Sequence, residues 1–549
     1  MTMAVFKPFC KLMMLVMLLI PKVGSLSAQT NYYFYVQFAN KNNSPYSLSN
    51  PSAFLSQRAI DRRTAFNIPC DSTDLPVNPS YISQISDLGI SVHNASKWMN
   101  GATLYLSDSS KMSQVRILPF VKFTEYTGKQ VGTVQAPQQR VKEQTTFDYG
   151  IANTQIAQLN GKVLHNQGYL GQGIHIGVID AGFTNANTNP AFDSLRLQGR
   201  LLGTKDIINP TSNIYAEDNH GANVLSIMTG NLPGQFLGTA PQASFWLIRT
   251  EYGPTEYKVE TDFWCSGIEF ADSVGVDIVT SSLGYSTFDD TSMNFAYTEM
   301  NGKVSRASRA AAIASNKGIM VLVAAGNEGA NSWHYITSPS DAEGIFCVGA
   351  VTSTGASSYF SSFGPSADNR IKPDICAMGT STAIVNIAGT PSNGNGTSFA
   401  TPAMAGMVAC LLQRYKATDQ HPSISNLLQS VIKSGNLYSS PTAQMGYGIP
   451  DFAVAINNLS ALNGLHNAAA NSFIAAYNSS SKKLTVRFAD TCNLTNSALK
   501  IYSATGQLVY EQPISSYNNE ITSERLLAGV YFVAATLNSK TVTEKFIVY

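Results

Sequence analysis

Five short apolar runs, separated by polar and helical stretches, dominate the middle of the chain. They are residues 174–179, 245–248, 277–281, 319–325 and 345–351. A run that is apolar throughout predicts a strand buried on both faces, and alternation of such strands with helices predicts a parallel sheet. Residues 304–316 read as one of these helices. We therefore predict an α/β domain over residues 149–456, with its functional site at the carboxyl ends of the strands.

The patterns on either side of this region differ from it. Residues 32–38 are rich in aromatic and β-branched residues and predict a strand, while residues 81–88 predict a helix. Residues 29–127 thus predict a small α+β unit. Residues 128–148 are rich in Gln, Lys and Thr, which predicts an exposed linker open to proteolysis. Short strands with turn residues between them predict a β-sandwich over residues 463–549.

The N-terminus has the pattern of a secretory signal peptide. Lys7 and Lys11 precede the apolar run 12–20, and small residues follow up to Ala28. We predict a signal peptide over residues 1–28, cut close to Ala28. The apolar run is too short to span roughly 30 Å of hydrocarbon, and no later segment is long and apolar enough, so no transmembrane segment is expected.

Composition narrows the choice of function. The chain has 549 residues, of which 44% are hydrophobic and 13% are charged, with a net charge of +1. This length predicts several domains. No basic stripe indicates nucleic acid as a partner. Six cysteines remain beyond the predicted signal peptide, scattered and without C-x-x-C spacing. No zinc site is therefore expected, and the spacing assigns no disulfide.

Three residues with catalytic chemistry stand at the ends of predicted elements. Asp180 follows a buried strand, His220 opens a helix, and Ser398 stands where a glycine turn meets a helix N-terminus. Taken singly each is weak, because a serine in such a turn is usually an N-cap. Together they fit nucleophilic catalysis. A serine hydroxyl needs a base to take its proton, imidazole titrates near neutrality, and a carboxylate can orient the imidazole.

The segments around these three residues, in this order, resemble the catalytic boxes of subtilisin-like serine proteases. The resemblance covers about residues 150–455. It implies a doubly wound, mostly parallel α/β fold. It also implies a secreted or surface-attached serine endopeptidase, which cuts protein or peptide substrates through an Asp180–His220–Ser398 triad and an acyl-enzyme intermediate.

The resemblance extends to residues 324–329, where it implies that Asn327 donates its side-chain amide to the oxyanion. Residues 281–284 resemble the strand that pairs with extended substrate. The substrate-binding residues implied are Ser282, Leu283, Gly284, Ala325 and Gly326. The neighbouring Glu328 either accepts basic substrate side chains or is a solvated loop carboxylate. The chemistry needs no cofactor or metal, and although calcium sites are common in the family, no acidic loop has the spacing that would assign one.

Both flanking units also resemble known modules. The N-terminal unit is similar to the prodomains of such enzymes, which assist folding and inhibit until they are cleaved; an unrelated accessory module is the alternative. The C-terminal unit resembles the sorting domain of the type IX secretion system of Bacteroidetes, on residues 501–507, 527–533 and 545–548. A carbohydrate- or protein-binding sandwich is the rival interpretation. If the resemblance holds, the type IX machinery is a partner, and the protein is exported through the periplasm and secreted or held at the cell surface.

Two other functions remain to be weighed. An esterase or lipase would need Gly-x-Ser-x-Gly and the reverse residue order, whereas this chain has Gly-Thr-Ser398-Phe-Ala. An inactive relative that serves as a peptide-binding or adhesin protein is the alternative that the sequence leaves open.

Overall fold

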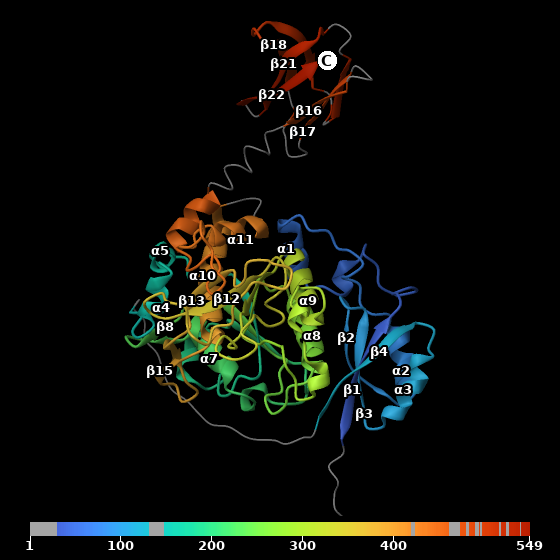
Figure 1. Cartoon of the computed structure of the whole chain (residues 1–549), viewed down its shortest axis with the longest axis vertical. Coiled ribbons are helices and arrows are strands. Elements are labelled where there is room, and N and C mark those ends of the chain that lie inside the picture. The colour runs from blue at the N-terminus through green and yellow to red at the C-terminus, as the bar shows by residue number, and fades with distance from the viewer. Residues whose placement is uncertain are drawn as a thin grey trace, which may run out of the picture.

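A computed structural model describes the chain in several segments. They are residues 30–130, 148–418, 423–460, 473–478, 483–488, 494, 497–514, 516, 518–522, 526–537 and 540–548. The predicted signal peptide and residues 131–147 of the predicted linker lie outside the described residues. Figure 1 shows the N-terminal unit in blue, the central unit from cyan to orange and the C-terminal strands in red.

The central unit is built on one seven-stranded sheet with the order β13-β12-β11-β10-β5-β9-β6, in which every neighbouring pair is parallel. The strands are β5 (His175–Asp180), β6 (Leu201–Asp206), β9 (Ser244–Arg249), β10 (Ile278–Ser281), β11 (Met320–Ala324), β12 (Phe346–Val351) and β13 (Ile375–Met378). The five apolar runs of the sequence thus form the five inner strands, as predicted. The edge strands β6 and β13 were not predicted, because β6 ends in polar residues and β13 is short.

Helices cover both faces of this sheet (Figure 1). On one face lie α7 (His220–Thr229) and α10 (Thr397–Thr418), and on the other lie α8 (Val259–Val274) and α9 (Arg306–Asn316). Each pair shares a large apolar core with the sheet. The doubly wound α/β fold is therefore confirmed. Smaller elements are α4 (Asn153–Gln158), α5 (Lys162–Asn166), α6 (Asp193–Leu197), α11 (Ile424–Ile432), a helix at 452–460, and the two-stranded ribbons β7–β8 (Asn231–Leu232, Phe236–Leu237) and β14–β15 (Thr382–Val385, Pro391–Gly394).

The N-terminal unit is an antiparallel sheet of order β2-β3-β1-β4, with α2 and α3 on one face and α1 in contact with α8 of the central unit. Its elements are β1 (Asn31–Phe38), α1 (Gln57–Ala65), α2 (Pro79–Asp87), β2 (Ser91–Ser96), β3 (Gly101–Leu106), α3 (Met112–Arg116) and β4 (Val121–Gln130). This is the predicted α+β architecture. Strand β4 runs three residues past the predicted boundary at residue 127. It does so because Gly128, Lys129 and Gln130 continue the antiparallel pairing with Tyr33, Tyr32 and Asn31 of β1.

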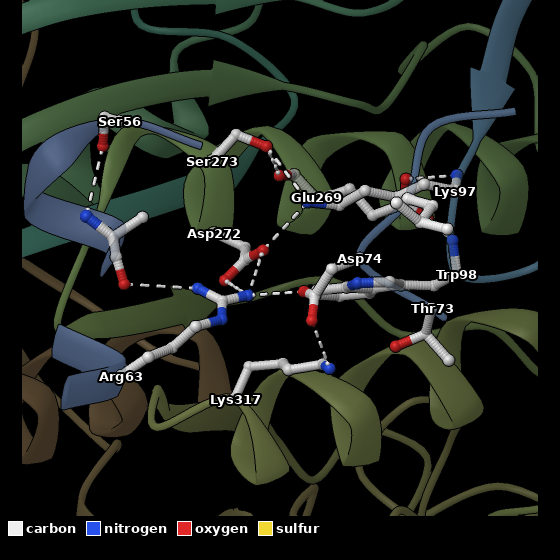
Figure 2. A network of polar contacts seen from close by, with 12 residues as sticks. Ser56, Arg63, Thr73, Asp74, Lys97, Trp98, Glu269, Asp272, Ser273 and Lys317 are labelled. Atoms are coloured by element: carbon white, nitrogen blue, oxygen red, sulfur yellow. Dashed lines mark hydrogen bonds and ion pairs between the residues drawn. The ribbon is translucent and has the colours of Figure 1, made fainter. Parts of the chain in front are cut away.

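The other face of the N-terminal unit is held to α8 by buried ion pairs (Figure 2). Asp272 lies in the last turn of α8, where the negative end of the helix dipole repels its negative charge. Arg63 and Lys97 of the N-terminal unit each approach its carboxylate to 3.0 Å. Arg62 lies 2.5 Å from the same carboxylate. Glu269, one turn earlier, accepts the Lys97 backbone N–H at 2.8 Å. Basic residues of one unit thus neutralise acids of the other.

The C-terminal strands form two sheets around one apolar core. The three-stranded sheet has the order β16-β17-β20 and the four-stranded sheet the order β19-β18-β21-β22. The strands are β16 (Phe473–Asn478), β17 (Lys483–Phe488), β18 (Ala498–Ser503), β19 (Leu508–Pro513), β20 (Asn518–Thr522), β21 (Gly529–Leu537) and β22 (Lys540–Val548). Two sheets that share a core are the predicted β-sandwich.

Two further predictions concern cysteines and membranes. The five cysteines within the described segments are all free thiols, and four of them are buried. Burial raises the pKa of Cys410 and Cys347, which keeps these thiols protonated and unreactive. Within the described segments, no helix has both the length and the apolarity that crossing a bilayer requires.

Candidate active site

Asp180 and His220 meet at the carboxyl end of the central sheet. Strand β5 ends at Asp180 and helix α7 begins at His220, as the sequence predicts. Nδ1 of His220 lies 2.8 Å from Oδ1 of the fully buried Asp180. The approach depends on Gly221, because a Cβ atom there would lie 2.5 Å from the Gly182 carbonyl oxygen and 2.8 Å from the Asp180 Cβ. A residue without a side chain thus lets the helix start against the strand end.

The charges around His220 favour its protonated form. Burial alone would lower its pKa, but the carboxylates of Asp180, Asp218 and Glu251 outweigh burial and raise the pKa of His220 to about 9. The surroundings thus stabilise the imidazolium. That is the species a general base becomes once it has accepted a proton.

Ser398 is the second residue of α10, and its main chain is held by an exchange of hydrogen bonds with Ser282. The Ser282 hydroxyl donates to the Ser398 carbonyl at 2.9 Å, and the Ser398 hydroxyl donates to the Ser282 carbonyl at 3.4 Å. The Ser398 carbonyl is open to this donor because Pro402, four residues later, has no N–H to complete the helical bond. The nucleophile candidate is therefore fixed against the segment that follows β10.

Asn327 follows β11 and faces the turn that leads into α10. Its Oδ1 accepts hydrogen bonds from the Thr397 backbone N–H at 2.9 Å and from the Thr397 hydroxyl at 3.0 Å. With the oxygen engaged, the Nδ2 group is left as the donor for a ligand. Gly396, with φ of +150°, lies on this side, and a Cβ atom there would come to 3.8 Å from Nδ2.

These four residues converge on one cavity of about 290 Å³, of which His220, Asn327 and Ser398 form part of the wall. The rest of its lining is Ala181, Asp218, Glu251, Gly253, Ser282, Leu283, Gly284, Ala324, Gly326, Glu328, Thr337 and Thr397. Asp180 lies behind His220. The Ser398 hydroxyl donates to the Ser282 carbonyl rather than to His220. Hydrogen bonds between catalytic groups often tighten only in the complex with substrate.

The predicted substrate-binding residues divide into two groups. Ser282, Leu283, Gly284 and Gly326 line the cavity. Leu283 and Gly284 form no backbone hydrogen bonds within the described residues, so this edge is open to an added peptide strand. Ala325 is not brought to the cavity: it is fully buried, its N–H donates to the Val348 carbonyl and its carbonyl accepts from Thr337.

Sequence reasoning missed an acidic loop that borders the cavity. Glu251 and Glu256 lie in the segment after β9, and Glu260 lies in the first turn of α8. Carboxylate oxygens of the three lie within 4.8 Å of one another, which makes this the one group of acids or histidines among the described residues able to hold a metal ion. A signal was present, since Glu251 follows a buried strand at the predicted site edge.

The geometry can be compared with known proteins. Residues 171–448, just over half of the chain, match the model of the Subtilase family. Residues 33–145 match "Peptidase S8 propeptide domain, Bacteroidota", and residues 478–549 match "Secretion system C-terminal sorting domain".

Two subtilisins are similar in sequence to a large part of this chain. Subtilisin NAT of Bacillus subtilis subsp. natto is 28% identical over 346 residues, which covers 62% of this chain and 76% of the relative. Subtilisin of Bacillus pumilus is 27% identical over 299 residues, with 54% and 94% covered. Among solved structures, the prenylagaramide maturation protease PagA matches with a TM-score of 0.43 and 22% identity, over 55% of this chain and 98% of that chain.

Proposed function

Because the chain belongs to the subtilase family and is a subtilisin-like serine endopeptidase, we propose that Asp180, His220 and Ser398 form its catalytic triad and that it works through an acyl-enzyme intermediate. The observation that carries this proposal is the convergence of three distant segments on one cavity, with Asp180 and His220 joined at 2.8 Å. The proposed chemistry needs no cofactor.

In this mechanism the Ser398 oxygen attacks the peptide carbonyl while His220 takes the hydroxyl proton through Nε2. Asp180 accepts a hydrogen bond from Nδ1, which holds the imidazole in the tautomer that has a free Nε2. The protonated imidazole then donates to the departing amine. Water repeats the sequence on the acyl-enzyme and releases the second product.

The negative oxygen of the tetrahedral intermediate needs donors that are in place before the reaction. We assign Nδ2 of Asn327 and the backbone N–H of Ser398 to this role. The Asn327 amide is oriented by the two bonds from Thr397 to its oxygen. The Ser398 N–H lies in the first turn of α10, where backbone N–H groups lack helical partners and the helix dipole favours a negative charge.

The two flanking units indicate where the enzyme works and that it is made as a zymogen. The C-terminal match is to a secretion-system sorting domain, and the protein is exported by the type IX system to the cell surface or the medium. The N-terminal unit is the propeptide of a zymogen. We propose that maturation cuts the chain within the predicted linker and that the mature enzyme then acts on proteins or peptides outside the cell.

Labelling with a fluorophosphonate tests the proposal, since this probe reacts with an activated serine. Purified protein that has lost its N-terminal unit should be labelled, and Ser398→Ala should not. A peptide-binding relative without activity would stay unlabelled in both forms. Absence of Ser398-dependent labelling in the processed protein would overturn the triad assignment.

A further inference from the structure

The walls of the active-site cavity carry three acids, and His220 is the one described lining residue that can become a cation. Among the described residues that line it are Asp218, Glu251 and Glu328, while none is Lys or Arg. Two of these acids, Asp218 and Glu251, lie on the side of His220, because their charges raise its pKa. The cavity wall thus has more acidic than basic groups, and two of its three acids lie beside His220.

Glu251 is placed to meet a substrate. It is partly buried and lines the cavity, and the Tyr285 hydroxyl donates to its Oε2 at 3.2 Å. Behind it, Glu260 is almost fully buried and accepts the backbone N–H groups of Tyr252 at 2.9 Å and Tyr257 at 3.3 Å. These bonds fold the loop so that its carboxylates face each other. The loop thus presents one acid to the cavity with two others at its back.

The three carboxyl groups of the acid cluster would repel one another if all were charged. One carboxylate oxygen of Glu256 is buried without any hydrogen-bond partner. Burial and the neighbouring acids raise the pKa of Glu251 to about 7 and of Glu256 to about 10, because the carboxylates cannot all be charged side by side. A cation that entered the cavity would relieve this repulsion.

A bound peptide brings one particular side chain to this loop. Extended substrate that pairs with residues 282–284 points successive side chains to opposite sides. In this pairing we take the side chain before the scissile bond to enter the space between residues 283–284 and residues 326–328, which line the cavity together with Ser398. The preceding side chain then faces the opposite wall, which is formed by His220 and Glu251.

We propose that Glu251 is a specificity-determining residue that selects substrates with arginine or lysine at the second position before the scissile bond. This inference rests on the proposed function of the same site. Glu251 forms an ion pair with the basic side chain, while Glu256 and Glu260 are positioning residues, whose carboxyl groups lie beside Glu251 and, through the bonds of Glu260 to the loop backbone, hold it in place. The substrate class is thus exported or extracellular polypeptide with a basic residue one position before the residue that acylates Ser398.

Two peptides that differ at one atom position test the proposal. Both peptides are internally quenched, and they carry either arginine or its neutral isostere citrulline at the second position before the cleaved bond. Mass spectrometry of the products shows which bond is cleaved. For processed wild-type enzyme we expect kcat/KM to favour arginine by roughly tenfold, the effect of one partly buried charge pair. The preference should shrink as salt is added, because the pair is open to solvent.

Variants assign the effect to one residue. Glu251→Gln should bring the arginine-to-citrulline ratio close to one. Glu343→Gln, which removes an exposed carboxylate that does not line the cavity, should keep the wild-type ratio. A ratio close to one in the wild type, or a wild-type ratio in Glu251→Gln, would overturn the proposal.

Two more measurements separate a wrong specificity assignment from a wrong function and from a metal site. Ser398-dependent fluorophosphonate labelling is recorded on every variant. If the enzyme is labelled but shows no preference for arginine, only the specificity assignment is wrong. If it is not labelled, the proposed function itself is wrong. If EDTA lowers the melting temperature of the wild type but not of Glu256→Gln, and the arginine preference is absent, the three acids hold a divalent cation and the proposal is wrong.

Discussion

Replacing Asp272 by asparagine should weaken the binding of the N-terminal unit to the protease unit. Its carboxylate faces three cations of the N-terminal unit whose side chains are at most 10% exposed. After the change, Arg63 keeps Asp74 at 2.7 Å and Arg62 keeps the Val276 carbonyl at 2.6 Å. Lys97 keeps the Ser273 hydroxyl at 3.2 Å and the face of the Trp98 ring, but loses its one carboxylate partner among the described residues.

The size of the effect follows from these partners. Removing one side of a buried ion pair costs about 3–5 kcal/mol, and we take the lower end because two of the three cations keep other acceptors. About 3 kcal/mol corresponds to roughly a hundredfold weaker affinity between the two units. The unfavourable interaction of Asp272 with the dipole of α8 is present in the free and the associated protease unit alike, so it does not change this affinity difference.

Dilution of the processed enzyme measures this affinity. The chain is cut in the linker, both pieces stay associated, and the concentration at which half of the peptidase activity appears is recorded. Asp272→Asn should show activity at about a hundredfold higher concentration than the wild type. Asp87→Asn, an exposed carboxylate on α2, serves as the control. A shift below threefold, or an equal shift in the control, would refute the reasoning.

The pH dependence of the same contact has a definite sign. Burial disfavours the charge of Asp272, but Lys97, Arg62 and Arg63 outweigh burial and lower its pKa. A carboxyl group with a lowered pKa stabilises the assembly above its ordinary value near 4, and this contribution is lost as the pH falls through the lowered pKa. Acid should therefore separate the wild-type units, and Asp272→Asn should be less sensitive to acid.

Three other changes test the site. The pH profile of kcat/KM should rise with a midpoint above the ordinary histidine pKa. Glu251→Gln should lower that midpoint, because it removes one charge that raises the pKa of His220. A midpoint that does not move would contradict this. Asn327→Ala should reduce kcat by about 10²–10³-fold in single-turnover kinetics with little change in KM, because its amide stabilises the oxyanion of the transition state. If the loss appears in KM instead, Asn327 binds the substrate in the ground state. Ser282→Ala should lower stability by roughly 1–3 kcal/mol, because the Ser398 carbonyl then has no donor; thermal unfolding in a Ser398→Ala background measures this without self-digestion.

The fold and the positions of the triad candidates followed from local patterns. The apolar run of β5 stops at Asp180, and a strand end is the place where a parallel sheet presents its site. The glycine turn before Ser398 similarly predicts where α10 begins. Such signals involve neighbours in the sequence, so a single chain is enough to detect them.

The contacts that sequence analysis missed join distant segments. Ser282 and Ser398 exchange hydrogen bonds across 116 residues, and Arg63 reaches Asp272 across 209. No periodicity encodes such a pair. Pro402 did carry a local signal, because a proline near the start of a helix leaves the carbonyl four residues earlier open. Ala325 was predicted to bind substrate but is fully buried. A motif match therefore shows that a segment lies near a site, whereas burial decides which of its residues reach the cavity.

The wide separation of the catalytic candidates along the chain has a consequence for how the enzyme is made. Asp180 and His220 are synthesised well before Ser398, which stands 178 residues after the histidine. In a growing or unfolded polypeptide, these three residues are therefore not brought together, and Ser398 has no base beside it. Peptidase activity can arise only once α10 has docked on the sheet beside α7. Completion of the fold is itself the first safeguard that protects the producing cell.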